Sequence, residues 1–129
     1  MVKTRRIFLG ATILVSLAVS GPLGRGAADK TFEGEIADSQ CALGVHSQNQ
    51  SHKVMIDMGS AGKTPADCAR YCVRERGGRF VLQSKHTVYK LDKQELAEKS
   101  AGMKVKVTGT FDPKINTILV RTIEPIRSK

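Results

Sequence analysis

The sequence has no tryptophan and few other aromatic residues. Phenylalanine and tyrosine make up 5% of its 129 residues. Domains that bind single-stranded nucleic acid stack the bases on aromatic side chains along a basic groove. After the N-terminal segment the chain offers only Phe32, Tyr71, Phe80, Tyr89 and Phe111. Because three of these fall on strand faces that we expect to point inward, we predict that nucleic acid is not a partner.

Sequence motifs of catalytic sites are missing as well. No G-x-S-x-G, H-E-x-x-H, phosphate-binding or dinucleotide-binding loop occurs. The acidic residues are scattered singly, and His86 lies in an expected turn with no acid or nucleophile beside it in the sequence. We therefore predict that the protein is not an enzyme and has no catalytic residues.

Long hydrophobic runs are missing except for one near the N-terminus. A basic stretch with Arg5 and Arg6 precedes apolar residues 7–20, and small residues follow up to residue 28, which is the layout of a secretory signal. Residues 4–9, T-R-R-I-F-L, resemble the twin-arginine export signal. The run is shorter than the roughly 20 residues that span a bilayer. We therefore expect residues 1–28 to be cleaved, membrane contact only through this segment before cleavage, and a periplasmic or secreted mature protein.

The expected mature part, residues 29–129, has the size of a single domain. Four of the 21 lysines and arginines precede residue 29, so 17 basic residues remain against 12 acidic ones and the net charge is about +5. This surplus favours acidic partners, such as a protein or polysaccharide of the cell envelope. Lys104, Lys106 and Arg121 are the candidate contacts, because they lie on strand surfaces that we expect to be exposed.

Alternation of apolar and polar residues predicts five strands. The expected strands are residues 31–38, 79–83, 87–91, 103–111 and 117–124. A short polar turn separates the second strand from the third, which predicts a hairpin. In the fourth, MKVKVTGTF, the apolar residues and glycine face one way and the lysines and threonines face the other.

Two helices are expected between these strands. Thr64, Pro65 and Asp67 suit the N-cap, first and third positions of a helix that runs to about Arg76 and ends at Gly77. In the second helix, residues 93–101, Asp92 is the expected cap and Gly102 the expected end. Residues 39–63 show no strong period, and we expect no regular element there.

Five strands with a helix between the third and fourth are the element order of the OB-fold, a small Greek-key barrel. Gly34 and Gly109, inside the first and fourth strands, suit the strong coiling of such a barrel. We predict a mainly β protein with two short helices, folded as a five-stranded OB-fold-like barrel; an open α+β sheet is the alternative. The first connection is long, because residues 39–78 form an insertion with a helix and all three cysteines.

Several motifs resemble those of a family of small exported bacterial domains of unknown function with an OB-like barrel. They are D-S-Q-C-A at 38–42, C-x3-C-V at 68–73, G-G-x-F-V-L at 77–82, V-Y-x-L at 88–91 and V-x-V-x-G-T at 105–110. The resemblance covers nearly the whole mature chain, and the cysteine spacing is its most specific part. It implies the fold and export, but no activity.

The three cysteines, Cys41, Cys68 and Cys72, are an odd number for an exported protein. Residues i and i+4 of a helix have Cβ atoms about 5–6 Å apart, whereas a disulfide needs about 3.5–4.5 Å. Cys68 and Cys72 should therefore not bond to each other. In an oxidising compartment we expect Cys41 to pair with one of them and staple the insertion to the first strand. The remaining thiol is either a buried small hydrophobe or the link in a disulfide-bonded dimer.

On this interpretation the protein is a non-enzymatic binding or accessory module of the cell envelope, without a cofactor. The alternative is a copper or zinc protein that uses all three cysteines as ligands. Two thiolates at i and i+4 can converge on one ion, and the segment after Cys41 adds His46, His52, Met55 and Met58. Sulfur with imidazole suits Cu(I) or Zn(II).

Thiol redox chemistry is the weakest alternative. Cys68 would lie in the first turn of its helix, where the helix dipole favours a thiolate, and Arg70 and Arg74 add positive charge nearby. The expected redox motif, C-x2-C beside a βαβ unit, is missing.

Overall fold

The computed structural model describes residues 27–44 and 52–127, apart from the side chain of His52. The expected signal segment with Arg5 and Arg6, and the candidate ligand His46, lie outside the described residues. No helix among the described residues combines the length and the apolar character needed to cross a membrane.

The protein is mainly β, with five strands in one sheet. The strands are β1 (Lys30–Asp38), β2 (Phe80–Gln83), β3 (Val88–Leu91), β4 (Lys104–Asp112) and β5 (Thr117–Pro125). Their order is β1-β2-β3-β5-β4, and the sheet closes because β1 pairs with both β2 and β4. All neighbours are antiparallel except β3 and β5. The five predicted strands are confirmed to within one or two residues.

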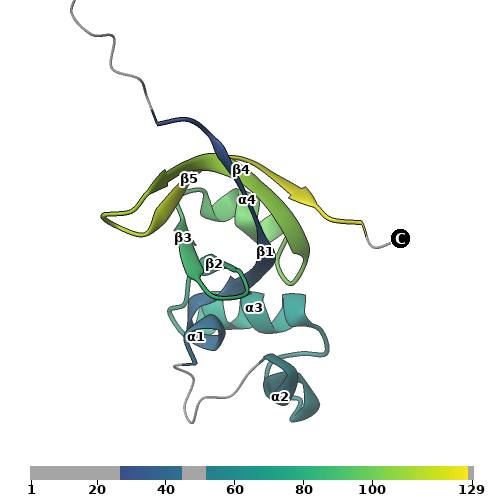
Figure 1. Cartoon of the computed structure of the whole chain (residues 1–129). Coiled ribbons are helices and arrows are strands. Elements are labelled where there is room, and N and C mark those ends of the chain that lie inside the picture. Colours follow the sequence, from purple (N-terminus) through teal and green to yellow (C-terminus); the bar gives the residue numbers. More distant parts are fainter. Residues whose placement is uncertain (1–26, 45–51, 128–129) are drawn as a thin grey trace, which may run out of the picture.

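The described residues contain four helices: α1 (Ser39–Ala42), α2 (His52–Asp57), α3 (Pro65–Glu75) and α4 (Gln94–Lys99). The prediction of two helices is therefore wrong in number, although α3 and α4 are the two that were expected. Both unexpected helices lie between residues 39 and 63. They have four and six residues and lie in a segment without a helical period. Helix α4 is as short as α2, but Gly102 marks its end in the sequence. In Figure 1, α1, α2 and α3 gather at one end of the barrel.

Helix α3 begins as predicted. Thr64 is the N-cap, Pro65 follows it, and the side chains of Thr64 and Asp67 form a capping box. Beyond the helix, Gly77 adopts a left-handed φ of 68°. The backbone N–H groups of Arg76 and Gly78 both donate to the Cys72 carbonyl and close the last turn.

The predicted cap of α4 is wrong. Lys93 occupies the N-cap position without a side-chain hydrogen bond. Asp92 instead accepts a hydrogen bond from the backbone N–H of Val120 at 2.7 Å, so it links the end of β3 to β5. The position of the helix was predictable from its local pattern, but the strand that would come to lie beside Asp92 was not.

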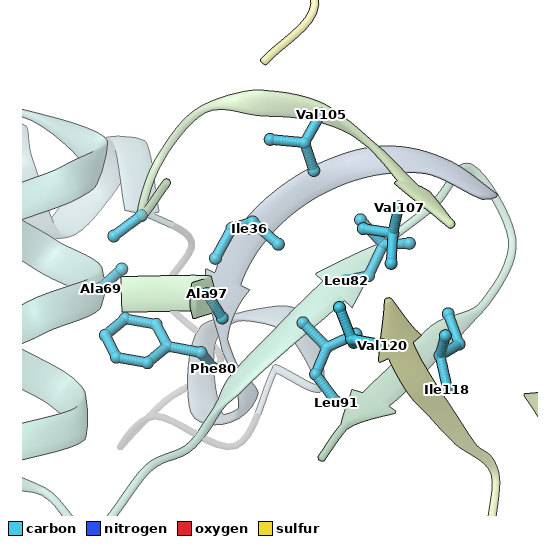
Figure 2. Packing of buried hydrophobic residues seen from close by; sticks show 11 residues of the cluster. Ile36, Ala69, Phe80, Leu82, Leu91, Ala97, Val105, Val107, Ile118 and Val120 are labelled. Atoms are coloured by element: carbon cyan, nitrogen blue, oxygen red, sulfur yellow. The ribbon is translucent and has the colours of Figure 1, made fainter. Parts of the chain in front are cut away.

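The barrel interior is filled by aliphatic side chains from the strands (Figure 2). In β4, Val105, Val107 and Gly109 are buried as the alternation predicts, whereas Met103 is exposed because it precedes the strand. A Cβ atom at Gly109 would overlap the carbonyl oxygen of Leu119 on β5. The strands approach closely there, beside an irregularity in the β4–β5 register, as expected for a strongly coiled strand.

Candidate metal centre

Four side chains with metal-binding atoms meet where β1 passes into the insertion. Asp38 is the last residue of β1, Cys41 lies in α1, and Cys68 and Cys72 lie one turn apart on α3. One ligand atom from each of the four lies within 4.8 Å of all the others. Because α3 packs against β1, it brings residues 27 to 34 positions apart in the chain into one cluster.

The cluster is buried and is separate from the barrel core. Asp38, Cys68 and Cys72 have no exposed surface, and Cys41 is 9% exposed. Met55 and Ala61 pack with the three cysteines into a small second core. Free cysteines are often buried as small hydrophobes, but a completely buried carboxylate such as Asp38 needs compensating partners.

The predicted disulfide between Cys41 and Cys68 or Cys72 is not formed. All three side chains are thiols, and the Sγ atoms of Cys41 and Cys68 lie 3.9 Å apart. A disulfide has an S–S distance of about 2.05 Å. Two sulfurs bound to one tetrahedral zinc at about 2.3 Å lie roughly 3.8 Å apart. The spacing of Cys41 and Cys68 therefore matches two ligands of one ion better than a covalent bond.

Asp38 also holds the local backbone. Its Oδ1 atom accepts hydrogen bonds from the backbone N–H groups of Gln40 and Cys41, both at 2.9 Å, and so caps α1. This cap turns the chain at the end of β1 and places Cys41 over α3. Asp38 was not predicted as a ligand. The signal in the sequence was an acid three residues before a cysteine, at the end of an apolar strand.

The environment raises the pKa of all three thiols. Burial is the main cause for each, and the negative charge of Asp38 adds to it for all three. The pKa of Cys72 rises to about 12. Without a compensating cation these side chains are protonated at neutral pH.

The thiolate considered for Cys68 is not favoured, because burial raises the pKa of this thiol. The arginines invoked for that thiolate contact a different element. Arg74 forms an ion pair with Glu98 of α4 at 3.0 Å, and Arg70 donates to the Glu98 carbonyl. A redox enzyme needs a thiol with a lowered pKa, whereas burial raises the pKa of all three thiols here.

The other predicted ligands lie in different environments. Met55 is buried in the second core beside the cysteines. Met58, three residues later on the same segment, is 63% exposed and so is not part of the cluster. His52 begins α2, but its side chain is not described, and His46 lies outside the described residues. His86 is exposed in the turn between β2 and β3, where the sequence places it.

A cleft of about 360 Å³ leads from the surface to the cluster. It is lined by Glu35, Cys41, Lys53, Ile56, Asp57, Pro65 and Gln83. Cys41 is the one member of the cluster in this wall, which agrees with its small exposed surface. The cluster is therefore reached from solvent at the Cys41 sulfur.

Comparison with known proteins found no match for the chain among protein-family models, curated proteins or solved structures. The function is therefore inferred from the residues of the site.

Proposed function

We propose that the protein is an exported, non-enzymatic module of the cell envelope that binds one zinc ion through Asp38, Cys41, Cys68 and Cys72. The observation that carries the proposal is the convergence of these four buried side chains, whose ligand atoms lie within 4.8 Å of one another. Four protein ligands leave no open position on a tetrahedral zinc, which is typical of a structural site rather than a catalytic one.

The mixture of donors favours zinc over Cu(I). Zinc accepts thiolate and carboxylate ligands together, whereas Cu(I) prefers sulfur and imidazole ligands to a carboxylate. The carboxylate of Asp38 is a hard donor at the centre of the cluster. The two positive charges of zinc also offset half of the negative charge of three thiolates and one carboxylate, and this compensation is what burial requires.

The strand order supports an OB-like barrel around this site. The order β1-β2-β3-β5-β4, with β3 parallel to β5 and α4 between β3 and β4, suits a small closed Greek-key barrel with one helix in that connection. In this arrangement zinc ties α1 and α3 of the long first connection to the end of β1. The ion thus supplies the staple that the sequence alone assigned to a disulfide.

The basic strand surface proposed for an envelope partner is partly neutralised within the chain. Lys106 lies 3.7 Å from Glu33, and Arg121 forms an ion pair with Asp29 at 2.6 Å. The side chains of Lys104, Lys106 and Arg121 are all exposed, as expected. The metal site therefore has the stronger structural support.

The test is metal binding by the full chain purified under reducing conditions. Native mass spectrometry should show one zinc ion per chain, and competition with a chromophoric chelator should give its Kd. C41A, C68A and C72A should each weaken binding by more than the roughly 10–100-fold that loss of an outer-shell partner costs. M58A is the matched control, because Met58 is exposed, and should leave the Kd unchanged.

Asp38 needs a variant that separates its two roles. In D38N the side-chain oxygen can still accept from the N–H groups of Gln40 and Cys41, but the carboxylate charge is lost. If Asp38 is a ligand, D38N should fold normally and bind zinc at least about tenfold more weakly. Failure of the reduced wild-type chain to bind zinc would refute the proposal. Preference for Cu(I) with no effect of D38N would reassign the site to copper held by the three sulfurs.

A further inference from the structure

Cys41 and Cys68 approach each other from different elements. Their Sγ atoms, on α1 and α3, are 3.9 Å apart, and would have to move together by about 1.9 Å to reach the length of a disulfide. Cys68 and Cys72 are instead held one turn apart on a single helix, which keeps their Cβ atoms too far apart to bond. The helix thus makes Cys41 one partner of any disulfide within the cluster, and its Sγ atom lies 3.9 Å from that of Cys68.

We propose that zinc and a Cys41–Cys68 disulfide are alternative states of this one site. The inference rests on the proposed function, because it adds a redox control to the same zinc ligands. In the reduced chain the four ligands hold the ion. Oxidation joins two of the four, leaving only Asp38 and Cys72, and the ion is lost.

The cleft decides which thiol meets an oxidant first. Cys41 lines it, whereas Cys68 and Cys72 do not and have no exposed surface. The wall carries two acids, Glu35 and Asp57, and one base, Lys53. A small neutral disulfide therefore suits the cleft as a reactant, and its sulfur would reach Cys41.

The reaction is two successive thiol–disulfide exchanges. The Cys41 sulfur attacks an external disulfide RSSR, forms a mixed disulfide Cys41–S–S–R and releases RSH, which carries the Cys41 proton. The Cys68 sulfur then attacks the Sγ atom of Cys41, and the second RSH leaves with the Cys68 proton. The two cysteines lose two electrons and two protons, and RSSR is reduced to two RSH. Cys72 remains a thiol.

The experiment uses the reduced full chain with and without zinc. Each sample is incubated with excess bis(2-hydroxyethyl) disulfide without oxygen, quenched by alkylation and mapped by non-reducing peptide mass spectrometry. The zinc-free chain should give a Cys41–Cys68 disulfide with Cys72 alkylated. With zinc at about 100 times its Kd only about 1% of the chain is zinc-free, so the rate should fall about 100-fold. Oxidised chain should bind no zinc until it is reduced.

Two variants show the order of events. C72A keeps the reacting pair and should form the same disulfide, whereas C68A should stop at the mixed disulfide on Cys41. A Cys41–Cys72 bridge in the wild-type chain, or oxidation at the same rate with and without zinc, would overturn the inference and leave the zinc site standing. A reduced chain that binds no zinc would overturn the proposed function, and the alternation with it, whichever disulfide forms.

Discussion

At the scale of single residues, Gly102 combines a left-handed backbone with no room for a side chain. It follows α4 with a left-handed φ of 72°, and its N–H donates to the Ile36 carbonyl of β1 at 2.7 Å. A Cβ atom here would overlap the backbone nitrogen of Ala66 and lie 2.8 Å from its Cα atom. Gly102 therefore lets α4, β1 and the first turn of α3 meet.

We predict that G102A lowers the free energy of unfolding by about 2–5 kcal/mol. The left-handed conformation costs about 1–2 kcal/mol with a side chain, and overpacking against the α3 backbone adds about 1–3 kcal/mol. G77A is the matched control, because Gly77 has a φ of 68° and open space around it. It should show only the conformational cost in urea unfolding. Equal losses in the two variants would mean that the contact with α3 is unimportant.

At the scale of elements, α3 carries two of the four proposed ligands, Cys68 and Cys72. Its N-terminus is held by reciprocal hydrogen bonds. Asp67 Oδ2 accepts from the N–H groups of Lys63 and Thr64, and Thr64 Oγ1 accepts from the N–H of Asp67, all at 3.1 Å. These bonds set where the helix begins, and so the direction in which Cys68 and Cys72 project.

The same hydrogen bonds predict a pH dependence. Bonding with the Thr64 side chain, and then with the Lys63 backbone, lowers the pKa of Asp67 below its usual value of 3.8. A carboxyl whose pKa is lower in the folded state stabilises the fold above its unfolded pKa, and this stabilisation is lost as the pH falls through the folded pKa. The zinc-free wild type should thus be more stable than D67N at pH 7, and the difference should shrink below about pH 4.

Urea unfolding of both zinc-free chains at pH 7 and pH 3 measures this difference. E124Q, at an exposed acid near the end of β5, is the control and should stay within about 0.5 kcal/mol of wild type at pH 7. A D67N deficit that is the same size at both pH values would show that the charge of Asp67 does not support the cap.

At the scale of the whole molecule, the buried side chains form two separate cores. The barrel core is built from strand residues such as Leu82, and the second core surrounds the cysteines. No residue belongs to both buried groups. A cavity-forming substitution in the barrel core should therefore lower the free energy of unfolding without displacing the four proposed ligands.

L82A should lower the free energy of unfolding by about 2–5 kcal/mol, because Leu82 is completely buried and its truncation leaves a cavity. L119A, at a leucine on β5 that is 48% exposed, should change it by no more than about 0.5 kcal/mol. Where L82A is still folded at 25 °C, its Kd for zinc should equal that of wild type. A loss of zinc affinity as large as that of C72A would show that the two cores are coupled.

Most of the regular structure could be predicted from local pattern. The strands alternate, the capping residues of α3 lie at their required spacing, and Gly77 and Gly102 mark the ends of helices. The misses have physical causes. Helices α1 and α2 lie in a polar segment without a helical period, and Asp92 bonds to a strand that follows it by more than 20 residues. Asp38 caps α1, and its proposed role as a ligand depends on residues far away in the chain.

The sequence by itself determined the five strands and helices α3 and α4, because hydrophobic period, capping and turn chemistry act between residues a few positions apart. It also placed three sulfurs on two segments. Only the tertiary structure decided how those segments meet. The strands close, α3 docks against β1, and Asp38 and Cys41 come to face Cys68 and Cys72 at a spacing that suits one ion better than a covalent bond. Such contacts depend on how distant surfaces pack, which no local pattern encodes.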